Sequence, residues 1–421
     1  MKFTTTAFAL VLTATAGSAY AQYGTPAPPT SQQPTHMEQQ DQADQSKKPS
    51  VQPSSKARKA LIELQKAVDA NDTATIPAKL AEANAVANTK EDHYLIGNMR
   101  LKAAVAAKDN VAMAAAIDAI AASGYESPAK VARLYMAVGS HFYEAKQASQ
   151  AIGLYQKGLA LDPQSADLLI NLGEAQSAAG QKGEAVATFQ RAIQIQTAAG
   201  QKPQEALYKT ALSIAYDAKL PSTGELSRQW VAAYPTADSW RNAIAIYRNE
   251  SHQDVEGTLD LLRLMQATGS LTTPGDYRLF AESAADQSNF NEAQAVLDAG
   301  VAAKIVSPSD PSFRDDFAGI KAKPKATAAD LEEALKSSPS AINVIRIGDR
   351  FAAMGNYSRA AEVYRQALGQ SGVDANIANL HLGMALARGG DKAGATAALN
   401  AVTGPRGDIA KFWLIYVKQH G

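Results

Sequence analysis

A repeated spacing constrains the fold of this chain more than any other feature of its sequence. A glycine is followed twelve residues later by an alanine and four residues after that by a bulky apolar residue, in four sets: Gly139, Ala151, Tyr155; Gly173, Ala185, Phe189; Gly348, Ala360, Tyr364; and Gly383, Ala395, Leu399. The first two sets are 34 residues apart and the last two are 35 apart. Such a period indicates one supersecondary unit that is copied along the chain.

The unit is helical. From Lys56 to the end of the chain, apolar residues recur at intervals of three and four, and Gly, Asn, Asp or Pro separates the apolar segments. Each unit then consists of two antiparallel helices, neither of which can bury its apolar stripe alone. The glycine allows the two helices to approach closely, and the small alanine accepts a neighbouring ring. The sequence therefore predicts an all-α protein of stacked helix pairs.

These positions resemble the tetratricopeptide repeat family, whose pattern contains a bulky residue, Leu-Gly, Tyr, Gly, Ala, an aromatic residue, Ala and Pro. The clearest copy contains Tyr135, Val138, Gly139, Phe142, Ala151, Tyr155, Gly158 and Pro163. The resemblance implies a right-handed α-α superhelix, or solenoid, of such helix pairs. It also implies a concave groove, lined by the first helix of each pair, that holds a peptide or protein.

The predicted organisation divides the chain into eight segments. These are a signal peptide (1–21), a disordered Pro/Gln-rich linker (22–55), degenerate helical repeats (56–131), two clear repeats (132–199), degenerate repeats (200–308), an irregular connection with a helix (309–340), two C-terminal repeats (341–404) and a capping helix (405–421). The prolines between Ser307 and Thr327 indicate a break between two halves of the solenoid. The sequence leaves open whether the C-terminal helix caps the last repeat or docks on a partner.

The first residues have the pattern of an export signal. Lys2 precedes an apolar stretch from Phe8 to Ala16, and the small residues Ala19 and Ala21 predict cleavage before Gln22. The stretch is too short for a membrane anchor, which needs about 20 apolar residues. Six of the 18 prolines lie in residues 22–55, which predicts a mobile tether without a core of its own. The expected location is the bacterial periplasm, with secretion as an alternative.

The composition excludes several classes of function. The chain has 41 Lys+Arg, 41 Asp+Glu and no Cys, so no basic field for nucleic acid and no thiolate chemistry are expected. The six His do not share a helix face at metal-ligand spacing, and each is expected to be a surface or packed residue. No phosphate-binding loop and no nucleophile elbow occurs. We therefore expect no cofactor, no metal and no catalytic residues.

The predicted groove is the remaining place for a site. Some family members hold a peptide's terminal carboxylate with Lys, Asn and Arg there, but the clear repeats of this chain do not match that clamp. Groove-facing positions carry Met136, Ser140, Ile170, Asn171, Glu174, Arg346, Asp349, His381, Met384 and Arg388. The more suggestive set, which we interpret as a contact for an anionic peptide, is Arg241, Asn242, Arg248 and Arg278. The alternative is that these arginines pair with nearby acidic residues on a solvated face.

The sequence favours a non-enzymatic, exported scaffold or adaptor that binds proteins or peptides in the cell envelope. A component of a machine for polysaccharide or outer-membrane assembly or export is one alternative. A helical enzyme that acts on the cell wall is another. The sequence does not give the partner or the oligomeric state.

Overall fold

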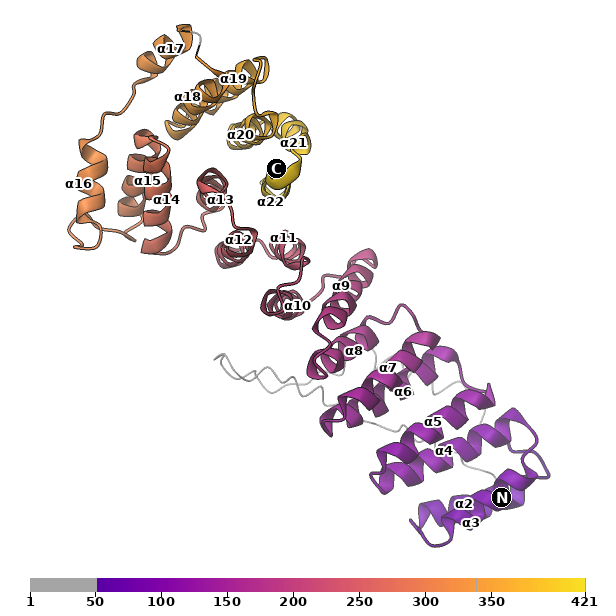
Figure 1. Cartoon of the computed structure of the whole chain (residues 1–421). Coiled ribbons are helices and arrows are strands. Elements are labelled where there is room, and N and C mark those ends of the chain that lie inside the picture. Colours follow the sequence, from indigo (N-terminus) through magenta and orange to yellow (C-terminus); the bar gives the residue numbers. More distant parts are fainter. Residues whose placement is uncertain (1–50, 338, 421) are drawn as a thin grey trace. The chain divides into compact units, whose positions relative to one another are not determined.

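All regular structure in the described part of the chain, residues 51–337 and 339–420, is helical in the computed structural model (Figure 1). The predicted signal peptide and almost all of the predicted linker lie outside these residues. The chain divides into two units, Met1–Gln201 and Lys202–Gly421, and each is described by itself.

Unit 1 is built from helix pairs that follow one another along the chain. Consecutive helices make most of the contacts, as expected for stacked repeats. The helices are α2 (Arg58–Asp69), α3 (Ile76–Val86), α4 (Lys90–Ala106), α5 (Asn110–Ser123), α6 (Pro128–Glu144), α7 (Ala148–Leu161), α8 (Ala166–Ala178) and α9 (Lys182–Ala198).

Unit 2 begins with further pairs and ends with a single helix. Its first helices are α10 (Glu205–Asp217), α11 (Thr223–Ala233), α12 (Ala237–Ser251), α13 (Val255–Ala267), α14 (Pro274–Asp286), α15 (Phe290–Ala302) and α16 (Arg314–Ala322). The remaining helices are α17 (Ala328–Lys336), α18 (Ala341–Ala353), α19 (Tyr357–Leu368), α20 (Ala375–Arg388), α21 (Lys392–Asn400), the short 3-10 helix η1 (Gly404–Arg406) and α22 (Gly407–Gln419).

One residue in a left-handed conformation turns the chain inside each helix pair. The nine turns of the described residues carry Asn71, Lys108, Lys146, Gly180, Lys219, His252, Ser288, Gly355 and Gly390, all with positive φ. A left-handed residue ends a helix while it lets the next backbone N–H groups satisfy the last carbonyl groups. The chain thus forms nine helical hairpins, and only three of their turns use glycine, which is why turn residues alone do not reveal them.

The repeated glycines sit where the two helices of a hairpin touch. A Cβ atom on Gly139 would lie 2.5 Å from the ring of Tyr155, and one on Gly348 would lie 2.5 Å from the ring of Tyr364. Gly173 meets Phe189 in the same way, and Gly383 meets Leu399. This is the close approach that the spacing of the sequence predicts. A larger residue at these positions would force the two helices apart.

The proline-rich segment lies inside unit 2 and joins α15, α16 and α17, so it does not separate the two units. Phe313, at its start, is 2% exposed, and its ring centroid is 6.5 Å from that of Phe317. Near its end, the side chain of Asn291 donates to the carbonyl of Ala326 (2.9 Å) and accepts from the N–H of the same residue (3.1 Å). The contacts of Asn291 fasten the end of the segment to α15, while Phe313 packs on Phe317 within the segment.

The C-terminal helix does more than cover the last repeat. It packs on α20 and α21, and it also contacts α11 and α13 near the start of the unit (Figure 1). Phe412 is fully buried, with its ring centroid 5.4 Å from that of Tyr247. The side chain of Gln419 donates to the carbonyl of Val231 (2.8 Å). The last helix of unit 2 therefore packs on helices near the beginning of the unit, and we call this contact the closure of unit 2.

Across the described ranges, 51–337 and 339–420, none of the helices has both the length and the apolar character that a membrane crossing requires.

Candidate functional site

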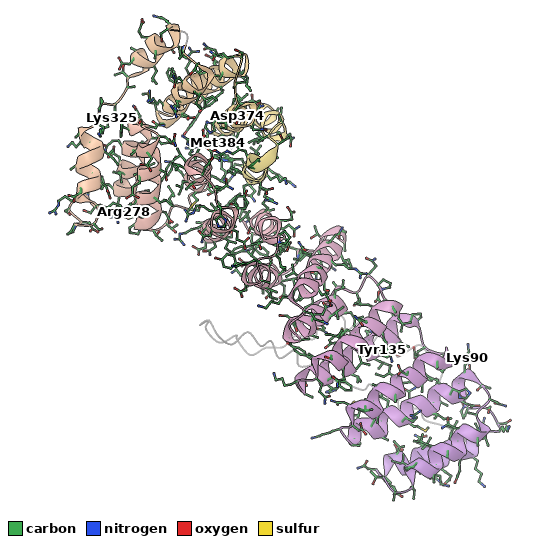
Figure 2. The ribbon with its side chains drawn as sticks, viewed as in Figure 1. Lys90, Tyr135, Arg278, Lys325, Asp374 and Met384 are labelled. Carbon is green, nitrogen blue, oxygen red and sulfur yellow. The ribbon has the colours of Figure 1, made fainter. Side chains whose placement is uncertain are left out.

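The arginines that the sequence singled out have acidic partners. Arg241, on α12, donates from Nε to Asp276 of α14 (2.9 Å), and Arg278, on α14, donates from Nε to Asp316 of α16 (3.1 Å). Figure 2 shows Arg278 at the side of α14 that faces α16. The guanidinium of Arg278 also lies 4.3 Å from the centroid of the Phe313 ring. Both arginines thus pair with nearby acidic residues, which is the alternative to a contact for an anionic peptide.

The two other members of that set differ in exposure. Arg248 is half-buried; burial lowers its pKa, as does the charge of Arg241, whereas Asp276 opposes the shift. Asn242 is exposed. The structure places Arg241 and Arg248 near the same carboxylate of Asp276, while Arg278 turns to a different helix. Their part in binding an anionic peptide stays a prediction.

A network of buried charges joins helices of unit 2 that are far apart in the sequence. Arg263, on α13, donates to Glu292 of α15 through Nε (2.7 Å) and Nη2 (2.8 Å), a bidentate pair. Its Nη1 donates to Asp260 (3.0 Å), which is fully buried. Asn289 donates a further hydrogen bond to Glu292 (2.9 Å).

His381, on α20, lies between two carboxylates of this network. Its Nδ1 is 2.8 Å from Asp349 of α18, and its Nε2 is 3.0 Å from Asp260 of α13. Burial by itself would lower the pKa of His381, but the two carboxylates outweigh it and raise the pKa to about 10. The histidine is therefore an imidazolium that holds α13, α18 and α20 together. The sequence predicts each His to be a surface or a packed residue, and His381 is packed, in an ionic environment.

Asp349 connects the network to α19. Burial would raise the pKa of its carboxyl group, yet His381 and Arg263 lower it well below its usual value, and the hydroxyl of Tyr364 donates to it (2.7 Å). Two cations, Arg263 and His381, thus face three carboxylates: Asp260, Glu292 and Asp349. The buried network keeps one net negative charge.

An open polar cavity of about 340 Å³ lies beside the network. Its wall comes from the α14–α15 turn, the end of α17 and one face of α18. The lining residues are Asp286, Gln287, Ser288, Ala334, Ser337, Pro339, Asn343, Arg346, Ile347 and Arg350. A cavity of this volume is at the lower end of the range of small-molecule sites.

Two arginines of α18 dominate the charge of this cavity. Arg346 and Arg350 are one helical turn apart, so they share a face. Arg350 donates from Nη2 to the carbonyl of Ser288 at 3.4 Å, a long hydrogen bond. Within residues 51–337 and 339–420, Arg346 makes no hydrogen bond or ion pair. Asp286 supplies the cavity's one carboxylate, so its lining has a net charge of +1.

A second, smaller cavity of about 30 Å³ shares Gln287, Arg346 and Arg350 with the first. It has room for about two water molecules. Its wall includes Arg263 and Asp349 of the buried network, together with Glu256, the pKa of which is raised by burial. The two arginines of α18 therefore stand between an open cavity and the buried charges.

The sequence identified part of this region. Arg346, Asp349 and His381 occupy positions that were expected to face the groove, whereas the partners Asp260 and Arg263 were missed. A signal for them exists, because two charges three residues apart interrupt the apolar run from Leu259 to Met265 on a helix. No group of three or more His, Cys, Asp or Glu side chains suited to a metal occurs in the described part of the chain.

Comparisons with known proteins agree on the repeats. Residues 142–213 and 345–408 each match a model described as a tetratricopeptide repeat. A search of curated proteins found no match to this chain.

Solved structures that match this chain include a tetratricopeptide repeat protein from Parabacteroides merdae, with 12% identity, coverage of 70% of this chain and 99% of that chain, and a TM-score of 0.29. A Rap protein complexed with competence and sporulation factor has 11% identity, coverage of 79% and 90%, and a TM-score of 0.24. The quorum sensor NprR from B. thuringiensis has 12% identity, coverage of 74% and 97%, and a TM-score of 0.21. Likenesses at this level do not bear on the function of this chain.

Proposed function

We propose that this chain, a tetratricopeptide repeat protein in residues 142–213 and 345–408, is a non-enzymatic scaffold that binds a protein or peptide in the bacterial cell envelope. The signal-like sequence at residues 1–21 supports export, and the repeats support a role in binding.

The observation that carries the proposal is the open cavity beside α18. Asn343, Arg346 and Gln287 line it, and none of these side chains has a hydrogen-bond or ionic partner among residues 51–337 and 339–420. Polar groups that the fold itself does not use are available to a partner. The predicted cluster at Arg241 and Arg278 differs, because a partner would have to compete with Asp276 and Asp316 there.

Capture of partners after mild crosslinking in cells that produce the protein tests this proposal. Mass spectrometry would compare the wild type with Arg346→Glu/Arg350→Glu and with Arg241→Glu/Arg278→Glu. Arg365→Glu is the matched control, because Arg365 is an exposed arginine on α19 that lies outside both sites. We expect a partner that the control retains and the α18 double variant loses.

Loss of the partner only in the Arg241/Arg278 variant would move the site to the predicted cluster. Retention of every partner in both double variants would overturn binding at either place. Cell fractionation, with sequencing of the mature N-terminus, tests export separately, and a protein that stays inside the cell with Met1 intact would contradict it.

A further inference from the structure

We propose that the cavity beside α18 binds a small solute that carries an oxyanion, a carboxylate or a phosphate, through Arg346 and Arg350. Binding of such a solute needs no protein partner. The inference rests on the same cavity as the proposed scaffold function, but its test uses the purified protein alone, so failure of solute binding and failure of partner capture are distinguishable.

The first reason is the state of the two guanidinium groups. Two like charges one turn apart on a helix repel each other mildly unless an anion lies between them. The acidic residues that line the two cavities do not form such a pair: Asp349 is committed to His381 and Tyr364, and Asp286 and Glu256 make no ion pair with either arginine. The fold thus holds two cationic groups side by side, and neither forms an ion pair within residues 51–337 and 339–420.

The second reason is the arrangement of donors along α18. Asn343, Arg346 and Arg350 follow the i, i+3, i+7 pattern, which places all three on one face of the helix, and all three line the cavity. A guanidinium fork matches two oxygens of a carboxylate or a phosphate in its plane, and an amide N–H adds a third donor. Three convergent donors suit one oxyanion better than they suit a neutral group.

The third reason is that Arg350 is already oriented. Its long hydrogen bond to the carbonyl of Ser288 ties the guanidinium to the α14–α15 turn, and Ser288 is held there with a φ of 56°. A guanidinium that is partly fixed loses less side-chain entropy when it binds an anion. Its remaining donors are left for a ligand.

The size and polarity of the cavity limit the rest of the solute. About 340 Å³ accepts a small molecule, and the lining has several polar side chains and no aromatic ring. Asp286 adds an acceptor for a hydroxyl or an ammonium group of the same solute. A hydroxylated carboxylate or a phosphorylated polyol fits this set of groups, and an acidic side chain presented by a peptide could supply the same oxyanion.

Calorimetric titration of the purified protein tests the site with four probes: gluconate, inorganic phosphate, an N-acetylated and C-amidated tri-glutamate peptide, and glucose. We expect at least one oxyanion probe to bind and neutral glucose not to bind. Tighter binding of gluconate or phosphate identifies a free solute as the source. Tighter binding of the peptide identifies a presented side chain.

Two single variants and a control locate the binding. Arg346→Gln and Arg350→Gln should each weaken the oxyanion by about tenfold or more, as expected for loss of a charge-assisted hydrogen bond. Arg365→Gln should bind like the wild type. Arg346 has no partner in the described residues, so its variant should keep the wild-type melting temperature, and loss of binding is then not a loss of folding.

Two results would overturn the proposal. One is the absence of binding by all three oxyanion probes at millimolar concentration. The other is equal binding by the wild type and the Arg346→Gln/Arg350→Gln protein, which would place the oxyanion elsewhere on the chain.

Discussion

Nη2 of Arg406 lies 2.9 Å from Oδ1 of Asp254, although 152 residues separate the two in the chain. The arginine is the last residue of η1, and the aspartate is the N-cap of α13. The guanidinium passes directly over Gly257, where a Cβ atom would collide with it. This contact, with those of α22, joins the end of unit 2 to its beginning.

Removal of the central ring of α22 should loosen the closure of unit 2. Phe412→Ala deletes a fully buried phenyl group that packs on Tyr247 and Trp240. We expect the free energy of unfolding of unit 2 to fall by about 3–5 kcal/mol. Hydrogen–deuterium exchange should rise in α11 and α13 while unit 1 exchanges as before.

Leu414→Ala is the control for this change, because Leu414 lies on the same helix but is only half-buried. It should cause a smaller loss. Equal acceleration of exchange in both units after Phe412→Ala would contradict a closure that is confined to unit 2.

The glycines at the helix contacts should not tolerate a methyl group. Gly139→Ala places a Cβ atom 2.5 Å from the ring of Tyr155, and we expect overpacking to lower the free energy of unfolding by about 1–3 kcal/mol. Urea unfolding of the purified protein measures the change.

Gly153→Ala is the matched control on α7. A Cβ atom there would have nothing within 4 Å, so the better helix propensity of alanine should stabilise the protein by about 0.5–1 kcal/mol. A destabilisation of equal size in both variants would show that backbone effects, rather than the contact with the Tyr155 ring, explain why position 139 is a glycine.

The buried network predicts a pH dependence with a definite sign. The pKa of His381 is about 10 in the folded chain against 6.5 ordinarily, so its contribution to stability is complete below about pH 6.5 and is lost as the pH rises through 10. His381→Gln removes one of the two cations that Asp260 and Asp349 face and leaves Arg263 as the other. We expect a loss of about 3–5 kcal/mol at pH 6 that shrinks toward pH 10.

Urea unfolding of both proteins between pH 6 and pH 10 measures this difference. His93→Gln is the control, since His93 is exposed on α4. A difference between the wild type and His381→Gln that stays constant over this range would mean that His381 is not the charged group of the network.

A buried carboxylate should make unit 1 sensitive to acid. Asp92 accepts hydrogen bonds from the N–H (2.8 Å) and the hydroxyl (2.7 Å) of Ser54 and from the N–H of Asn88 (3.2 Å). Burial would raise the pKa of Asp92, but these bonds outweigh it and lower the pKa below 3.8. The stabilisation is therefore present above pH 3.8 and is lost as the pH falls through the lower folded value.

Asp92→Asn should cost about 1–3 kcal/mol at neutral pH, because three donors lose a charged acceptor. Asp69→Asn, which removes an exposed ion pair with Lys102, should cost at most about 1 kcal/mol. Urea unfolding at pH 7 and pH 3.5 measures both. An Asp92→Asn protein with wild-type stability at pH 7 would show that the hydrogen bonds to the Asp92 carboxylate do not stabilise unit 1.

The helical hairpins could be predicted from the sequence because their determinants are local. Gly139 and Tyr155 lie sixteen residues apart, and the same pair recurs at Gly348 and Tyr364. The buried network could not be predicted, because Asp260 and His381 meet only through the fold of the whole unit. The ion pair of Arg241 could be predicted only in part. Its partner Asp276 lies on the next hairpin, and the sequence does not give the register of one hairpin against the next.

The closure of unit 2 has a consequence for how the protein can evolve. An open array gains or loses a repeat by duplication or deletion, because each repeat touches only its neighbours. In unit 2, one more hairpin between α13 and α20 would part His381 from Asp260 and Arg406 from Asp254. We therefore expect related proteins to differ in the number of repeats in unit 1. In unit 2 we expect them to differ by substitutions and to keep the same number of repeats.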